Sequence, residues 1–71
     1  MEYLKVVFDP NDLRDVLANG NVVGRTEAEL TLPPDFYRIT LSGAGYVPAF
    51  WEGQVTGTLV TQPLVIQFSH A

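Results

Sequence analysis

Apolar and polar residues alternate along most of this chain, and a period of two is typical of β-strands that bury one face. Four segments show the alternation clearly, and each predicts a strand: residues 3–8, 26–32, 36–41 and 64–68. The segment YVPAFWEGQVTGTLV, which starts at Tyr46, is also expected to be extended, with interruptions at its proline and glycines.

The same alternation predicts which aromatic side chains face the core. In residues 36–41 every second side chain is expected to point inward, and this leaves Phe36 on the outside. If residues 49–55 form one continuous strand, Trp51 lies on its inner side and Phe50 on its outer side.

The segment DPNDLRDVLANG, residues 9–20, admits two interpretations. As a helix, it would begin with Asp9 as the N-cap and Pro10 at the first helical position, and it would end at the Asn-Gly dipeptide. As a hairpin, it would contain a strand at residues 14–18 and use the same Asn-Gly dipeptide as a tight turn. Local signals do not decide between the two.

Short strands separated by frequent turn signals predict the fold class. We expect an all-β domain, a small antiparallel β-sandwich of five to seven short strands. One short helical turn near residues 10–18 is the alternative that stays open. The chain is long enough for one domain, residues 1–71.

Three motifs carry a resemblance to a known family: VLANGNVVGRT, LTLPPDFYRITL and GYVP. They resemble a PEGA-type domain, a small β-sandwich related to the carboxypeptidase regulatory-like and prealbumin-like folds. The resemblance extends from about Phe8 to Phe68, and Tyr46 matches the family's tyrosine. It implies a strand rather than a helix at residues 14–18. It also implies a non-catalytic adhesion or interaction module of cell-envelope, surface or regulatory proteins.

The chain departs from the family pattern at two positions. Asp35 stands where the family usually has glycine, and Glu27 stands where a proline commonly follows the Gly-x-Thr motif. A glycine in the turn implies a positive φ, which aspartate adopts at some cost. We therefore expect Asp35 to have a strained backbone.

The charge composition argues against one class of partner. The chain has four basic and eight acidic residues, with a net charge of −4. The basic residues are dispersed, and this argues against nucleic acid, which requires a clustered positive surface. The first ten residues resemble neither a signal peptide nor a membrane span. We expect a cytoplasmic location if the chain is complete, and a cell-envelope or extracellular one if it is an excised domain.

Candidate catalytic chemistry is sparse. The chain lacks cysteine, and its one histidine, His70, is next to the last residue, where a general base would lack a positioning partner. The acidic residues around Pro10 do not follow the spacing of a calcium-binding loop, and they suit a turn or cap. We expect no enzyme activity, no cofactor and no metal site.

The remaining signal is aromatic. We expect protein–protein contact, with a protein partner or with a second copy, and the candidate partner-binding residues are Phe36, Phe50, Trp51 and, more weakly, Tyr46. One open question is whether Phe36 and Phe50 converge on one outer face with three other residues: Tyr3, Val7 and Val65. A carbohydrate or other small ligand on the same aromatic face is the alternative function.

Overall fold

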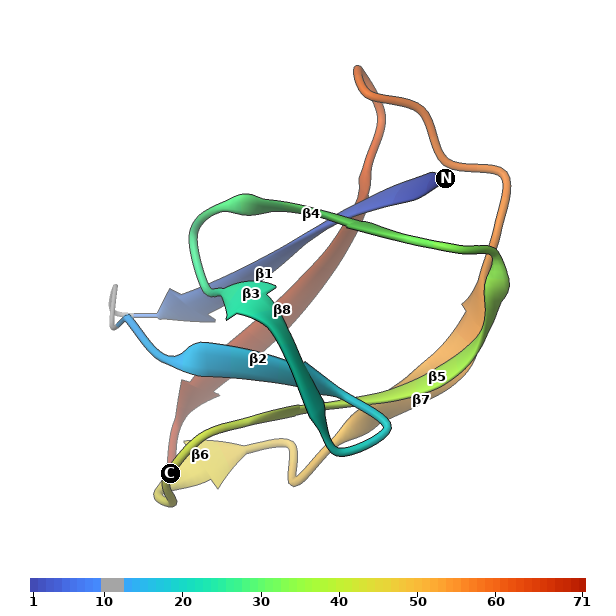
Figure 1. The fold of residues 1–71 in the computed structure, drawn as a ribbon. Coiled ribbons are helices and arrows are strands. Elements are labelled where there is room, and N and C mark those ends of the chain that lie inside the picture. The colour runs from blue at the N-terminus through green and yellow to red at the C-terminus, as the bar shows by residue number, and fades with distance from the viewer. Residues whose placement is uncertain (10–12) are drawn as a thin grey trace.

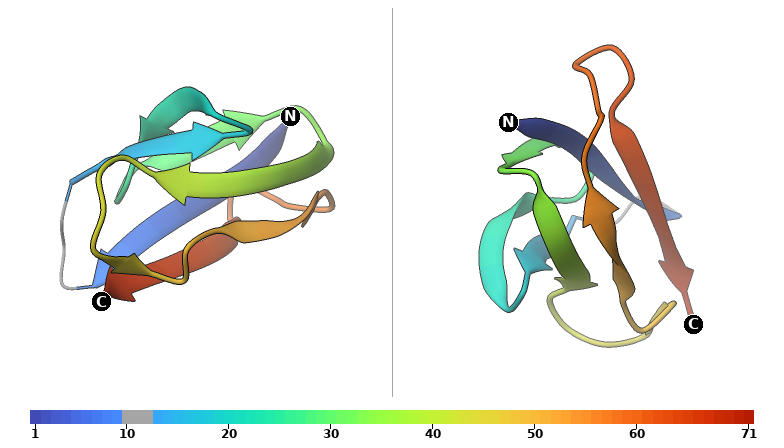
Figure 2. Two further views of the ribbon diagram at one scale, coloured as in Figure 1. Left: turned by 90° about the horizontal axis from the view of Figure 1, so that it is seen from below. Right: turned by 90° about the vertical axis from the view of Figure 1, so that its right-hand side faces the viewer.

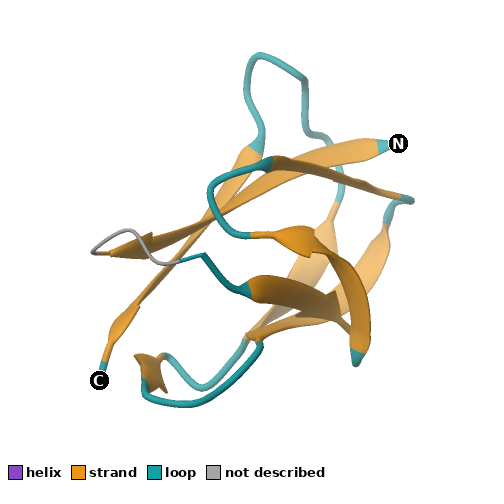
Figure 3. Ribbon diagram, turned by 60° about the vertical axis from the view of Figure 1, so that its left-hand side comes forward, coloured by secondary structure: helices purple, strands orange, loops and turns teal. Residues whose placement is uncertain are grey.

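The structure is a computed structural model that describes residues 1–9 and 13–71. These described residues form eight strands in two four-stranded sheets, and they contain no helix (Figures 1 and 3). The two sheets lie face to face as the layers of a sandwich (Figure 2). The predicted all-β sandwich is confirmed.

Each sheet combines strands from distant parts of the chain. Sheet A has the order β4-β1-β8-β6, with these bounds: β1 (Glu2–Asp9), β4 (Glu29–Leu32), β6 (Tyr46–Val47) and β8 (Leu64–His70). Sheet B has the order β3-β2-β5-β7, with these bounds: β2 (Asp15–Ala18), β3 (Asn21–Arg25), β5 (Asp35–Leu41) and β7 (Trp51–Val55).

The structure corrects the expected strand count and pairing. The described residues contain eight strands rather than five to seven, partly because residues 46–55 are divided between β6 in sheet A and β7 in sheet B. The sandwich is not wholly antiparallel, because β1 pairs with β8 in parallel, with Leu4 opposite Leu64. Parallel and antiparallel strands share the period of two, so alternation alone cannot distinguish them.

The segment that could have been a helix contains a strand. Residues 15–18 form β2, residues 13 and 14 are irregular, and residues 10–12 lie outside the described part of the chain. The turn from β2 to β3 uses Asn19 and Gly20, whose φ angles are 52° and 86°. Because these positive values suit an Asn-Gly pair, the turn chemistry decides in favour of the hairpin.

The core consists of the inward side chains of both sheets. Alternate residues of β1, β2, β4, β5 and β8 are buried, as the alternation predicts. Those with less than 2% exposure include Leu4, Val6, Phe8, Val16, Ile39, Val55 and Phe68. Phe8 and Phe68 lie opposite each other on β1 and β8. Burying such side chains contributes about 1.5–3 kcal/mol each.

Glu27 marks the corner between the sheets and shortens the strand that was expected over residues 26–32. Its φ is 65°, a left-handed conformation, so β4 begins only at Glu29. The Glu27 backbone amide donates to the Val6 carbonyl at 2.8 Å, and the Phe8 amide donates to its Oε2 at 3.0 Å. Glu27 thus continues the hydrogen bonding along β1 past the point where β4 begins. A proline could provide neither this φ nor this amide.

Asp35 does not have the expected positive φ. Among the described residues other than glycine, positive φ occurs at Asn19 and Glu27, and Asp35 is the first residue of β5, opposite Val55. Its Oδ1 accepts a hydrogen bond of 2.7 Å from the Phe36 amide. The family glycine therefore does not predict the backbone here, and the strained position lies at the other departure, Glu27.

The loop between β7 and β8 projects from the body beside the N-terminus (Figures 1 and 2). Glu2 anchors the start of this loop, because the Thr58 amide and hydroxyl donate to Glu2 Oε1 at 2.8 and 2.7 Å. The Tyr3 amide donates to Thr58 Oγ1 at 2.7 Å. The hydrogen bond from the Thr58 amide, followed by that from its hydroxyl, lowers the pKa of Glu2 below its ordinary value of 4.5.

The Glu27 corner can be tested with a pair of substitutions. We expect Glu27→Ala to reduce the free energy of unfolding by about 1–3 kcal/mol, because the Phe8 amide loses its acceptor. Glu27→Gly should be less harmful by about 1 kcal/mol, because glycine adopts a positive φ without strain. Urea denaturation measures both values, and a glycine variant no more stable than the alanine variant would contradict the assigned conformation.

The Glu2–Thr58 contact predicts a pH dependence. A carboxyl whose folded pKa is lowered contributes stability above its unfolded pKa of 4.5, and the contribution disappears as pH falls through the folded pKa. The stability difference between the native chain and Glu2→Gln should therefore be largest near neutral pH and shrink below pH 4.5. Denaturation at several pH values measures it, and a constant difference would argue against the contact.

Candidate functional site

Phe36 and Phe50 lie on the outer face of sheet B. Phe36 is on β5 next to the buried Tyr37 and is 51% exposed, and Phe50 directly precedes β7 and is 43% exposed. Covering large apolar side chains with this exposure by a partner is favourable, because apolar surface is removed from water. The two rings thus have the positions that the alternation predicts.

Arg38 makes polar contacts that link β5 to β7 and to the turn after β2 on this face. It lies directly opposite Glu52 on β7, and its Nε donates to Glu52 Oε2 at 3.0 Å. Its guanidinium carbon lies 4.4 Å from the centroid of the Phe50 ring. The Arg38 amide also donates to Asn19 Oδ1 at 2.9 Å, which ties β5 to the turn after β2. These contacts hold the Phe50 ring on the outer side of the sheet.

The strand register places further side chains in one row with Phe50. Val22 of β3 is opposite Leu17 of β2, and Leu17 is opposite Thr40 of β5. The register of β5 with β7 ends at Ile39 opposite Trp51, so one more residue places Phe50 beside Thr40. We call this set the cross-strand row: Val22, Leu17, Thr40 and Phe50. Its end members, Val22 at 64% and Phe50, are the exposed ones.

Trp51 and Tyr46 lie on the core side of their strands. Both are partly buried and pack against the hydrophobic core. The Trp51 ring covers Gly53, where an added Cβ would come within 3.0 Å of the indole. The Tyr46 hydroxyl donates to the Leu41 carbonyl at 3.1 Å and lies 3.3 Å from the Leu41 amide. Both side chains therefore support the sheets, and both are only partly exposed.

The five side chains whose convergence was in question are divided between the sheets. Phe36 and Phe50 belong to the outer face of sheet B. The others alternate with the buried residues of sheet A and lie on its outer face: Tyr3, Val7 and Val65. Because the core separates the two outer faces, the five cannot form one patch.

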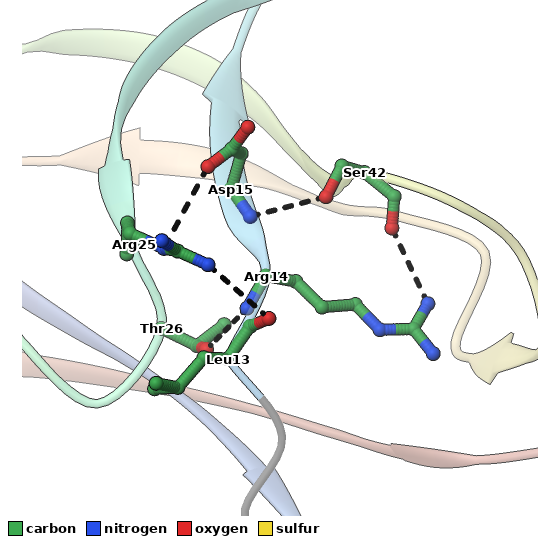
Figure 4. A network of polar contacts seen from close by, with 6 residues as sticks. All are labelled: Leu13, Arg14, Asp15, Arg25, Thr26 and Ser42. Atoms are coloured by element: carbon green, nitrogen blue, oxygen red, sulfur yellow. Dashed lines mark hydrogen bonds and ion pairs between the residues drawn. The ribbon is translucent and has the colours of Figure 1, made fainter.

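A polar network at one end of the sandwich was not anticipated from the sequence (Figure 4). The Arg14 amide donates to Thr26 Oγ1 at 3.0 Å, although Thr26 is only 1% exposed. The Arg14 guanidinium donates to the Ala44 carbonyl at 2.8 Å and lies 4.7 Å from the Phe8 ring centroid. The Asp15 amide donates to Ser42 Oγ at 3.1 Å. The network fixes the turn that leads to Tyr46, so its role is structural.

The described residues show few of the features of catalytic and metal-binding sites. The His70 ring packs edge-on against Phe8, with centroids 4.4 Å apart. Within residues 1–9 and 13–71, acidic and histidine side chains do not gather into a group that could hold a metal, and no pocket is formed. The acidic stretch around Pro10 lies largely outside this described part. Across the same residues, no helix has the length and apolar character needed to cross a bilayer.

No protein-family model, curated protein or solved structure matches this chain. The chain is therefore described by its architecture alone, which is a small all-β sandwich of two sheets.

Substitutions can separate the supporting aromatic residues from the exposed ones. We expect Trp51→Ala to lower the free energy of unfolding by about 2–3 kcal/mol, because it removes a half-buried ring from the core boundary. Phe50→Ala should cost less than about 1 kcal/mol, since it loses mainly the contact with Arg38. Urea denaturation measures both. Equal losses would mean that Phe50 is also part of the core.

Proposed function

We propose that this protein is a non-catalytic binding module that acts through protein–protein contact on the outer face of sheet B. Phe36 and Phe50 are its anchors. The observation that carries the proposal is their joint exposure on one sheet face, on either side of the Arg38–Glu52 ion pair. Exposed aromatic rings beside an arginine are the composition that is enriched at protein interfaces.

The remaining candidates have a different part in this function. Trp51 and Tyr46 act indirectly, because they pack against the core and so hold β7, which carries part of the binding face, and β6 of sheet A in place. This assignment is consistent with the resemblance to PEGA-type domains, whose members act as adhesion or interaction modules. The proposal assigns no reaction and no cofactor to the chain.

Carbohydrate binding is the second candidate for the same face. One observation favours it: Glu52 and Gln54, both exposed, lie on β7 opposite Arg38 and Phe36 and could bond sugar hydroxyls beside the rings. Two points weigh against it. The described residues form no pocket, and the Glu52 carboxylate is already bonded to Arg38.

Site-specific crosslinking tests the proposed function. The photoreactive residue p-benzoyl-phenylalanine would replace Phe36 or Phe50 in cells that produce the protein. Val65, 59% exposed on the outer face of sheet A, is the matched control position. We expect discrete protein adducts from positions 36 and 50 and far fewer from position 65.

The result that opposes the proposal is equally specific. No adduct from positions 36 and 50, in cells or in purified protein at about 1 mM, or equal adducts from position 65, would show that the outer face of sheet B is not a protein interface. If sugars bind the native chain and Phe50→Ser loses that binding without any change in protein adducts, the carbohydrate alternative is preferred.

A further inference from the structure

We propose that the partner on the outer face of sheet B is a second copy of this chain, related by a twofold axis that runs parallel to the strands between β2 and β5. This inference rests on the proposed function and names its partner. It is drawn from the order of side chains in the cross-strand row and from the distribution of charge on the face.

When a second copy presents the cross-strand row in reverse order, the side chains of the two rows fit together. Across sheet B its members follow in the order Val22, Leu17, Thr40 and Phe50. A twofold axis in the plane between the two copies, parallel to the strands, reverses this order in the second copy. Phe50 then faces Val22 of the second copy, and Thr40 faces Leu17. Each larger side chain meets a smaller one, as interdigitating sheet faces require.

The exposure of these side chains agrees with that arrangement. Val22 and Phe50 are 64% and 43% exposed, and they occupy the two ends of the row on β3 and beside β7. The two inner members, Leu17 and Thr40, are already half-buried by their neighbours. Contact between copies therefore covers the two exposed ends of the row, whereas Phe36, four residues from Thr40 along β5, lies outside it.

Charge also permits a second copy on this face. The chain has a net charge of −4, and this would oppose self-association if the charge were spread evenly. On the outer face of sheet B, however, Glu52 is bonded to Arg38, and Asp15 lies 3.7 Å from Arg25. The acidic groups of this face are thus neutralised within each copy.

The twofold arrangement also avoids contact between like charges. Asn19 follows β2 at the position beside Arg38, so Arg38 faces the uncharged Asn19 of the second copy. A twofold axis perpendicular to the strands at Arg38 would place Arg38 against its own copy, which is unfavourable. The parallel axis is therefore the arrangement that charge and side-chain size both favour.

The dimensions of the face predict a weak dimer. Neighbouring strands are about 4.8 Å apart, so the sheet is roughly 19 Å wide, and strands of about five residues are roughly 17 Å long. The footprint of roughly 300 Å² is well below the about 800 Å² per partner of a standard interface. Association is therefore expected to be weaker than that of a standard-size interface.

A charge exchange between two variants tests the arrangement. Val22→Lys and Phe50→Glu each place a charge against an apolar side chain of the second copy, so each should weaken association at least tenfold in sedimentation equilibrium. In an equimolar mixture, Lys at position 22 faces Glu at position 50 in the mixed dimer, and association should recover. A mixture of Val22→Glu with Phe50→Glu is the matched control and should not recover. Thermal unfolding confirms that each variant is folded.

Three results would overturn the inference. They are a native chain that stays monomeric up to about 1 mM, single variants that associate as well as the native chain, and a Lys–Glu mixture that recovers no better than the Glu–Glu mixture. A monomeric chain that still gives adducts with another protein from positions 36 and 50 would remove the second copy and leave the proposed function standing. The absence of adducts from positions 36 and 50, both in cells and in purified protein at about 1 mM, would remove the proposed function itself.

Discussion

The structure depends on burial of one side of every long strand between two sheets. A chain of 71 residues buries only about 60% of the surface that its unfolded form exposes, so few inward positions can be lost. Phe8 on β1 and Phe68 on β8 lie side by side on the two central strands of sheet A and are fully buried. Because inward positions must be apolar, the outward positions are the ones left free for function.

Burial alone does not close a small sandwich, because its strands are short and its corners expose backbone groups. Three polar side chains satisfy these groups in different places. Glu27 accepts from the amide of Phe8, Thr26 accepts from the amide of Arg14, and Glu2 accepts from the amide of Thr58. Each links segments that are distant in sequence. The corners therefore depend on individual hydrogen bonds, whereas the layers depend on pattern.

This difference explains how much the sequence could predict. Alternation predicts the inward side of β5 and the exposure of Phe36, because it follows from the geometry of a single strand. It cannot predict that β1 pairs in parallel with β8, or that residues 46–55 divide between the sheets, because these depend on partners elsewhere in the chain. The role of Arg14 was missed for the same reason, since its acceptor Ala44 is 30 residues away.

The candidate site shows the same limit. Phe36 and Phe50 could be placed outside from their own strands, but only the cross-strand register shows which residues are beside them. Leu17 and Val22 carried no signal of their own, because a short hairpin strand exposes such residues in many proteins. They acquire meaning from lying in line with Phe50, through Thr40.

The same constraint bears on the proposal that the outer face of sheet B binds a partner. Val7 and Val65 are on the outer face of sheet A, with Lys5 of β1 directly opposite Val65 of β8, so charge interrupts the apolar surface there. On sheet B the charge of Arg38 is paired with Glu52, and its guanidinium lies against the Phe50 ring. An arginine held in this way loses little conformational freedom when a partner covers it. The ion pair and the ring contact thus order Arg38 and Phe50 on the proposed binding face within the single chain.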